Sequence, residues 1–319
     1  MKLASGVSES VLDMPDGPEP PVPPVPPEPI IPSNEIWYVS TDGNIVTPHA
    51  SIPGMTSNTY VDGKGIIVFE NDVTSIPEWG FQGCTTLRSI SLSDAVTTIG
   101  NGAFNGCTGL ESILIPVNTE SIGNWVFVNC NNLTSVVWKT KECNTGSLLP
   151  TSVSSITFGN EVEVIPDQLC YNMSITSLVI PDSVTTIGWQ SFANCTYLTS
   201  VKFGNGLVSI GNEAFYGCNA LTSVKLQSGT TTIGNTAFGG CNSATSITLP
   251  ETIESIGSSA FNTCDSLQSF TIQAIVPPTI GEYAFKWPLT FTIYVPAEVV
   301  DTYKSAEGWS VYASIIQAI

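Results

Sequence analysis

Close copies of one stretch recur along most of the chain, and the clearest is Val208-Ser209-Ile210-Gly211-Asn212-Glu213-Ala214-Phe215-Tyr216-Gly217-Cys218-Asn219-Ala220-Leu221-Thr222-Ser223-Val224-Lys225-Leu226. The cysteines show the period, because they stand 23 residues apart at positions 84, 107 and 130 and again at 195, 218, 241 and 264. A phenylalanine precedes each of these cysteines by three residues. A repeat of this length is typical of solenoids, in which each coil packs only on its neighbours.

Each copy contains a segment Leu-x-Ser-x-x-x in which apolar and polar residues alternate. The alternation predicts a strand with one face inward, and each coil should add a parallel neighbour. The first inward positions are Ile67, Ile90, Ile113, Val136, Ile156, Leu178, Val201, Val224, Ile247, Phe270 and Ile293. This count predicts about eleven parallel strands, with two shortened coils between residues 139 and 162 and no domain boundary there.

A glycine column follows the short apolar piece of most coils, at positions 100, 123, 188, 211, 234, 257 and 281. Glycine suits either a positive φ or a close approach of two backbones. Pro77 and Pro166 occupy the same column in two coils and cannot adopt a positive φ. The Ala-Phe pair that comes next should direct a large ring into the core.

Composition excludes several classes of partner. The chain has 319 residues, of which 42% are hydrophobic, and 9 Lys+Arg against 27 Asp+Glu give a net charge of −18. Such a surface repels phosphate backbones and anionic lipid headgroups, so we expect no nucleic-acid partner. No stretch approaches the roughly 20 apolar residues of a membrane span, and no apolar signal core follows Met1. We therefore expect no membrane insertion.

The sequence divides into four parts. Residues 1–33 include the proline-rich run Pro18–Pro32, which predicts a disordered leader or extended polyproline II stalk. Residues 34–73 predict a β-rich cap, with a strand at 36–40 that returns as a hairpin at 45–47 and a second turn at 62–65. Residues 74–295 are the repeats. Residues 296–319 predict a C-terminal helical cap, because acidic residues precede Lys304 after Pro296.

The pattern Ile-Gly-x-x-Ala-Phe-x-x-Cys-x-x-Leu-x-Ser resembles the BspA-like branch of leucine-rich-repeat proteins, found in surface proteins of Bacteroidetes. The resemblance covers roughly residues 36–319 and includes Ile36-Trp37-Tyr38 and Gly308-Trp309. It implies a curved right-handed solenoid with a parallel sheet, an extracellular or cell-surface location, and adhesion or binding rather than catalysis. The sequence departs from the family at its start, where no signal peptide or lipoprotein cysteine is visible.

The nine cysteines favour free thiols over disulfides. Equivalent residues of adjacent coils lie about 4.8 Å apart with parallel Cα–Cβ bonds, whereas a disulfide needs Cβ atoms about 3.8 Å apart and converging. The seven cysteines in register should therefore form a buried ladder of small hydrophobic side chains. Cys143 and Cys170 fall outside this column, and the sequence leaves open whether either is reactive or paired.

The sequence gives little support for a catalytic or metal-binding site. His49 is the one histidine of the sequence, so it offers no His pair or Cys/His zinc site. The serines of the repeat recur because they occupy one column, and a nucleophile would need a base within reach. We expect neither a cofactor nor enzymatic activity.

The outward strand positions are the candidate binding surface, because packing determines the inward ones. One outward column contains Leu114, Val137, Thr157, Val179, Lys202 and Lys225. An apolar run beside two lysines on an acidic protein suggests a contact site. The alternative is that β-branched residues simply favour strands.

Three tryptophans, Trp79, Trp125 and Trp189, lie in the turn region of their coils. They can stack on a sugar or a protein, or they can cover the edge of the coil. We predict a non-catalytic adhesion module that contacts a host protein or glycan, for example of the extracellular matrix, through the solenoid face. The alternative is a structural or fibre component of a phage-like or secreted particle.

Overall fold

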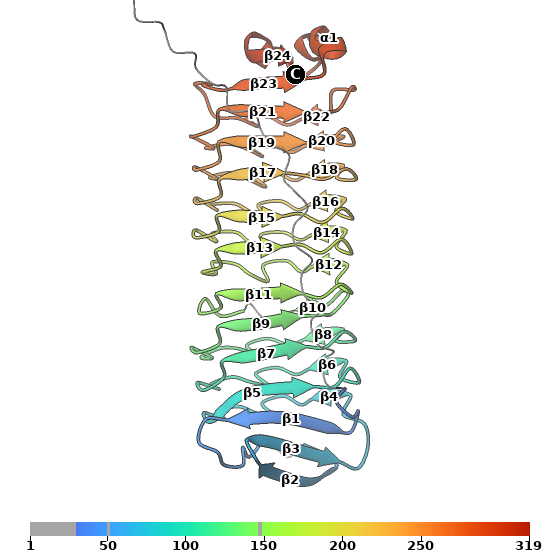
Figure 1. Cartoon of the computed structure of the whole chain (residues 1–319), viewed down its shortest axis with the longest axis vertical. Helices are drawn as coiled ribbons and strands as arrows, with labels where there is room; N and C mark the ends of the chain where they lie inside the picture. The colour runs from blue at the N-terminus through green and yellow to red at the C-terminus, as the bar shows by residue number, and fades with distance from the viewer. Residues whose placement is uncertain (1–29, 50–51, 146–148) are drawn as a thin grey trace, which may run out of the picture. The chain divides into compact units, whose positions relative to one another are not determined.

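Stacked coils form the protein, and each coil contributes one long and one short strand (Figure 1). A single coil cannot bury both of its faces, so neighbouring coils supply the rest of its core. A computed structural model describes residues 30–49, 52–145 and 149–319. Residues Ile31–Ile319 form one compact unit. The leader predicted for residues 1–33 lies, up to residue 29, outside the described residues.

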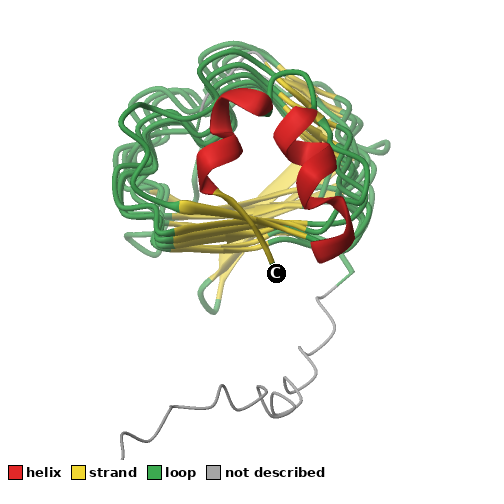
Figure 2. Ribbon diagram, turned by 90° about the horizontal axis from the view of Figure 1, so that it is seen from above, coloured by secondary structure: helices red, strands yellow, loops and turns green. Residues whose placement is uncertain are grey.

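The long strands stack in parallel on one side of the solenoid (Figures 1 and 2). Equivalent serines pair from coil to coil, as in Ser112 with Ser135, so the register follows the repeat. These strands are β5 (Leu87–Leu92), β7 (Ser112–Ile115), β9 (Ser135–Trp138), β11 (Ser155–Phe158), β13 (Ser177–Val179), β15 (Ser200–Lys202), β17 (Ser223–Lys225), β19 (Ser246–Leu249), β21 (Ser269–Ile272) and β23 (Thr292–Val295).

The short strands line a second side of each coil and also pair in parallel (Figure 2). Most of them contain one buried residue that faces inward, such as Ile210. They are β4 (Ser75–Ile76), β6 (Thr98–Ile99), β8 (Ser121–Ile122), β10 (Asn144–Thr145), β12 (Val164–Ile165), β14 (Thr186–Ile187), β16 (Ser209–Ile210), β18 (Thr232–Ile233), β20 (Ser255–Ile256) and β22 (Thr279–Ile280).

The phenylalanine column forms a stacked ladder through the core. Phe215 and Phe238 lie with ring centroids 5.2 Å apart and planes 1° apart. Phe81, Phe104 and Phe127 stack in the same way at 5.6 and 6.0 Å. The prediction that the Ala-Phe pair directs a ring inward is confirmed.

The glycine column serves close approach between coils and not a positive φ. A Cβ atom on Gly211 would lie 2.8 Å from the carbonyl carbon of Gly188, and one on Gly123 would lie 2.6 Å from the backbone nitrogen of Asn101. Positive φ instead occurs two residues later, for example at Glu213 with φ 54°. The backbones of successive coils therefore meet where the repeat has glycine.

The N-terminal cap differs from its predicted form. The hairpin joins β2 (Met55–Val61) to β3 (Lys64–Phe69) through Asp62 and Gly63, whose φ values of 49° and 80° suit a type I′ turn. Residues 45–47 form no strand. Strand β1 (Glu35–Ser40) instead lies between β3 and β5 and is antiparallel to both.

Ile67 therefore does not belong to the parallel series that its spacing predicted, because β3 runs antiparallel to its neighbours. The eleventh parallel strand lies at the other end, where β24 (Ile316–Ala318) pairs with β23. The C-terminal cap also contains the 3₁₀ helices η1 (Ala297–Val299) and η2 (Ser310–Ile315) and the helix α1 (Val300–Ser305). The predicted helical cap is confirmed.

Candidate functional site: the strand face

The outward column predicted from the sequence forms a row on the strand face, which we define as the outward side of the long strands. Ser91 pairs with Leu114, Leu114 with Val137, and Val137 with Thr157, on strands β5 to β11 of one hydrogen-bonded sheet. Leu114 and Val137 are half-buried and Thr157 is exposed. A second outward row beside it consists of serines, so this part of the face carries small or uncharged side chains.

The row continues into the N-terminal cap, which sequence analysis did not include in the site. Trp37 pairs with Ser91, and Ile66 pairs with Trp37, so two further apolar side chains extend the row. The ammonium of Lys64 lies 3.0 Å from the centre of the Trp37 ring, a cation–π contact. The position of β1 between β3 and β5 creates this extension, and no spacing in the sequence indicates it.

The remaining predicted residues lie on other sheets. Val179 (61% exposed) pairs with Lys202 on the two-stranded sheet of β13 and β15. Lys225 lies on β17, in the next sheet, where it pairs with Thr248. Both lysines are exposed. The strand face thus carries an apolar row beside serines over β3 to β9, with Lys64 and Glu35 next to Trp37, and it carries two lysines over β15 and β17.

The three tryptophans do not form one cluster. Trp79 and Trp125 occupy the same positive-φ position, two coils apart, with φ 56° and 59°. The Trp79 ring lies directly against Gly102 of the coil between them, so it covers the coil edge. Trp189 stands one position earlier in its coil, where its backbone N–H donates to Asp167 Oδ1 at 2.6 Å. Trp125 and Trp189 are 60% and 43% exposed.

The cysteine ladder consists of free, protonated thiols. All nine cysteines are free, and eight of them are buried. Six of the seven ladder thiols donate to a carbonyl of the preceding coil, as Cys130 does to Phe104 at 3.1 Å, and Cys84 donates to Thr47 of the N-terminal cap. Burial raises the pKa of the Cys130 thiol to about 12. Such thiols are poor nucleophiles, because the thiolate is the reactive form.

Cys143 and Cys170, which the sequence left unassigned, are also free and buried. Cys170 occupies the phenylalanine column of its coil, because its carbonyl accepts from Cys195 Sγ as that of Phe192 accepts from Cys218 Sγ. Burial raises the pKa of Cys143 to about 12. Neither thiol is placed for catalysis.

Within the described residues, no group of three or more His, Cys, Asp or Glu side chains could hold a metal ion. In the same part of the chain, no helix is long and apolar enough to span a membrane. His49 is exposed in the N-terminal cap, and its backbone N–H donates to the Gly80 carbonyl at 2.8 Å.

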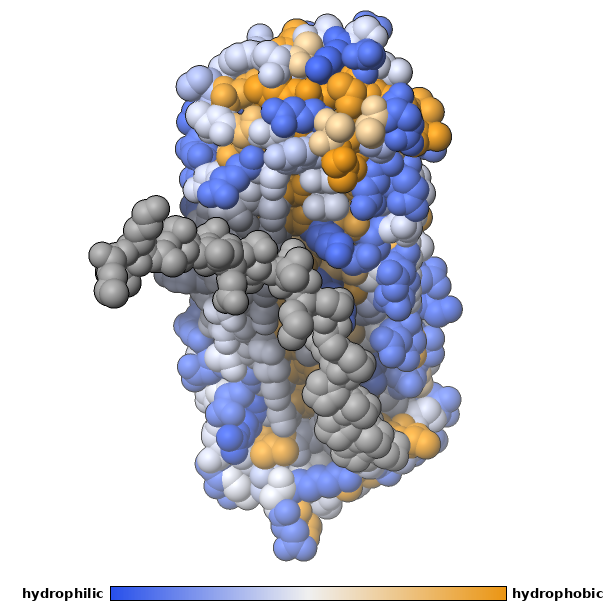
Figure 3. Space-filling view, turned by 45° about the horizontal axis from the view of Figure 1, so that its top comes forward, coloured by the Kyte–Doolittle hydropathy of each residue, from blue (hydrophilic) through white to orange (hydrophobic). Residues whose placement is uncertain are grey.

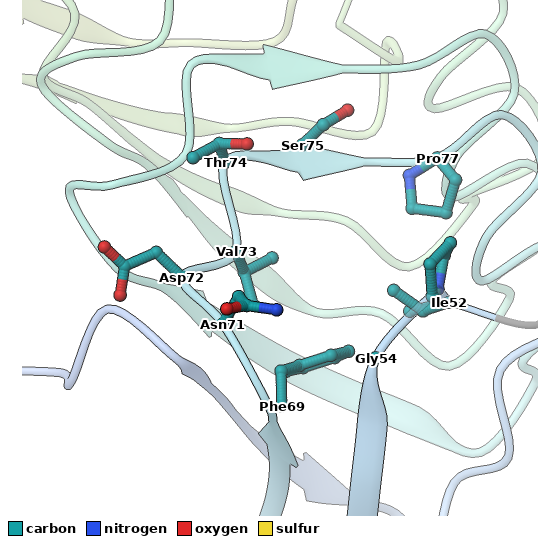
Figure 4. A pocket seen from close by; sticks show the side chains of 10 residues that line it. Ile52, Gly54, Phe69, Asn71, Asp72, Val73, Thr74, Ser75 and Pro77 are labelled. Atoms are coloured by element: carbon teal, nitrogen blue, oxygen red, sulfur yellow. The ribbon is translucent and has the colours of Figure 1, made fainter.

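A hollow of about 300 Å³ lies between the N-terminal cap and the first coil (Figure 4). Phe69, Val73 and Ile52 give it an apolar lining, and the Asp72 carboxylate points away from Ile52. Asp72 accepts a hydrogen bond from the Ser33 hydroxyl at 2.5 Å. The polar groups that line the hollow do not converge on a common point, as they do in a typical ligand site. We therefore interpret the hollow as the gap between the N-terminal cap and the first coil.

The repeats show to which protein family the chain belongs. Residues 65–174 and 163–291 match the model of the BspA type leucine rich repeat region, in six copies. The chain belongs to this family of BspA-type leucine-rich-repeat proteins. A search of curated proteins finds no match.

Three solved structures illustrate the likeness. A leucine-rich repeat protein from Bacteroides ovatus is 23% identical, with 84% of this chain and 91% of that chain covered and a TM-score of 0.41. A leucine rich cell surface protein from Faecalibacterium prausnitzii is 20% identical, with 92% and 95% covered and a TM-score of 0.34. The pneumococcal vaccine antigen PcpA is 17% identical, with 77% and 75% covered and a TM-score of 0.40.

Proposed function

We propose that this BspA-type protein is a non-catalytic binding module of the bacterial cell surface, which contacts a host protein or glycan through its strand face. The observation that carries the proposal is the continuous outward row Ile66, Trp37, Ser91, Leu114 and Val137. Its members belong to one hydrogen-bonded sheet, so a partner would meet a rigid surface. Rigid surfaces lose little entropy on binding.

The chemistry of this row suits a protein interface. The cores of interfaces are depleted of charged residues and enriched in aromatic ones, and their rims are polar. The row is uncharged in a protein of net charge −18, and Trp37 is its aromatic member. Lys64 lies at one end and Lys202 and Lys225 lie beyond the other, so an acidic partner would find positive charge on both flanks.

The cysteines support a role without catalysis. The strongest nucleophiles of the chain are buried thiols with raised pKa values, such as Cys195 at about 12. A protonated, inaccessible thiol cannot attack a substrate. The outward serines belong to a structural column, and a column of equal residues has no base of its own.

A glycan and extracellular-matrix array, probed with the full chain, tests this proposal. We expect binding to a small set of protein or glycan spots that weakens as salt rises, if the bound ligand is acidic. The same array probed with a Trp37→Ala variant should lose the signal. Equal binding by both proteins would contradict a role for the strand face, and binding to nothing would favour a structural component.

A further inference from the structure

A loop of exposed apolar residues projects between β21 and β22. Ile272 and Ile280 are eight positions apart, whereas their counterparts Leu249 and Ile256 in the preceding coil are seven apart, so this coil contains one extra residue. Ile275 and Val276 are 61% and 71% exposed. Figure 3 shows hydrophobic side chains gathered toward this C-terminal end of the solenoid.

The C-terminal cap holds both ends of this loop. The Tyr303 hydroxyl donates to the carbonyl of Ala274 at 2.9 Å, and the Trp309 indole N–H donates to the carbonyl of Pro278 at 2.7 Å. Both aromatic side chains are completely buried. The Ile275–Pro277 loop is therefore presented in a fixed position, which favours binding because little further order is required.

An open hollow of about 480 Å³ lies beside the loop. Ile275, Val276 and Pro277 give it an apolar part, and the exposed residues Glu251 and Glu254 also line it. Among the described residues that line it, none is positively charged. The hollow thus combines apolar side chains with two carboxylates, and no described residue that lines it supplies a positive charge to them.

The equivalent position of another coil shows that a cation can lie beside a glutamate here. The backbone N–H of Glu163 donates to Lys141 and that of Glu254 donates to Thr231, both at 2.9 Å, so the two glutamates hold equivalent positions. The Lys141 ammonium lies 3.9 Å from the Glu163 carboxylate. At Glu254 the uncharged Thr231 stands where Lys141 stands at Glu163, so an external cation can fill the same role.

We propose that this hollow binds an arginine side chain of a partner protein. The aliphatic part of arginine packs on the Ile275–Pro277 loop, and its guanidinium reaches Glu251 and Glu254. Arginine is enriched at protein interfaces, and it carries both an apolar stem and a planar charge. The site lies in the C-terminal part of the solenoid and is separate from the row proposed above.

Titration of the full chain with N-acetyl-arginine methylamide, followed by amide NMR shifts, tests the site. We expect shifts confined to the amides of residues 251–254, 275, 276 and 279, with weaker binding as salt rises. The citrulline analogue is the matched probe, because it has nearly the same shape and no charge, and it should cause little shift. Equal shifts with both probes, shifts spread over the whole acidic surface, or no shifts would each overturn the proposal.

Two variants separate the contributions of the carboxylates and the apolar side chains. Glu251→Gln with Glu254→Gln should weaken arginine binding about tenfold, because both charges are lost. Ile275→Ser with Val276→Ser should weaken it several-fold by removing the apolar side chains. Asp94→Asn with Glu120→Gln, two acids of another hollow, is the charge-matched control and should leave binding unchanged. All these side chains are solvent-accessible, so each variant should have the melting temperature of the parent, which verifies that it is folded. An equal loss of arginine binding in the control variant would contradict the assignment of the site to this hollow.

Discussion

The ring of Phe158 lies edge-on against Phe192, with centroids 6.2 Å apart and planes at 89°. Within the ladder itself, successive phenylalanines lie nearly parallel, as Phe192 and Phe215 do at 13°, whereas Phe158 lies at the end of β11. Phe203, at the equivalent strand position, also lies edge-on to a ladder ring, that of Phe215 in its own coil, at 79°. The coil of Phe158 has Cys170 in the ladder position, so Phe158 meets Phe192 of the next coil instead. Phe158, from the end of β11, supplies the aromatic contact that this smaller side chain cannot.

This arrangement predicts a coupled pair of substitutions. Phe158→Ala should destabilise the fold by about 3–5 kcal/mol by leaving a cavity, and Cys170→Phe alone should cost about 1–3 kcal/mol by overpacking. The double variant should lose clearly less than the sum, because a ladder phenylalanine would fill the vacated space. Urea denaturation of the four proteins measures the coupling, and strictly additive losses would contradict it.

The glycine column predicts an asymmetric response to added methyl groups. Gly211→Ala should destabilise by roughly 1–3 kcal/mol, because its Cβ would lie 2.8–2.9 Å from backbone atoms of the preceding coil. Gly159→Ala is the matched control. Its Cβ would meet Glu161 Oε2 at 2.6 Å and Lys139 Cγ at 3.0 Å, which are atoms of flexible side chains. Thermal unfolding should separate the two variants, and equal melting temperatures would contradict the close-approach argument.

The thiol ladder predicts protection from thiol reagents. The native chain should react slowly, and the unfolded chain without reductant should release about nine free thiols, because all nine cysteines are unpaired. The count of labelled cysteines by mass spectrometry provides the measurement. Four disulfides in the unfolded, unreduced chain would contradict the stacking argument.

Stability should also fall at alkaline pH. Burial raises the pKa of Cys84 to about 11 and that of Cys264 to about 12, from an ordinary value of 9.0. Their folded-state pKa values lie above the unfolded ones, so this stability is complete below pH 9 and is lost as pH rises toward 11–12. Each such thiol contributes a slope of about 1.4 kcal/mol per pH unit within that window. Urea midpoints at pH 8 and pH 10 under reducing conditions should show the fall.

A triple variant provides the control for this pH dependence. Cys107→Ala with Cys130→Ala and Cys218→Ala removes three buried thiols and should flatten the fall between pH 8 and pH 10. Other alkaline titrations, including that of Tyr312, whose pKa burial also raises, remain in both proteins. An unchanged slope in the triple variant would exclude the thiols as its source.

The repeat alone predicted the coil, the register and the outward row, because parallel stacking converts a constant spacing into pairing. It could not predict the N-terminal cap. Ile67 stands 23 residues before Ile90 and β3 runs in the same direction as β5, yet β1 lies between them and is antiparallel to both, because spacing does not show which strands are neighbours. The pairing of β1 with β5 joins segments that are far apart in the sequence and that no repeat spacing relates. The contribution of Trp37 to the strand face could therefore not be predicted from the sequence.

The outward row predicts the effect of charge on binding. Val137→Glu with Val179→Glu should abolish ligand binding, because carboxylates would be buried against the partner without compensation. Val179 is exposed and Val137 half-buried, and both point away from the core, so the melting temperature should stay nearly unchanged.

Thr248→Glu with Thr271→Glu, at the same outward positions of β19 and β21, is the matched control and should bind normally. Binding that survives in the Val137 and Val179 variant would place the site elsewhere, with Trp125 and Trp189 the next candidates. Unfolding of that variant would mean that the strand register is shifted by one residue.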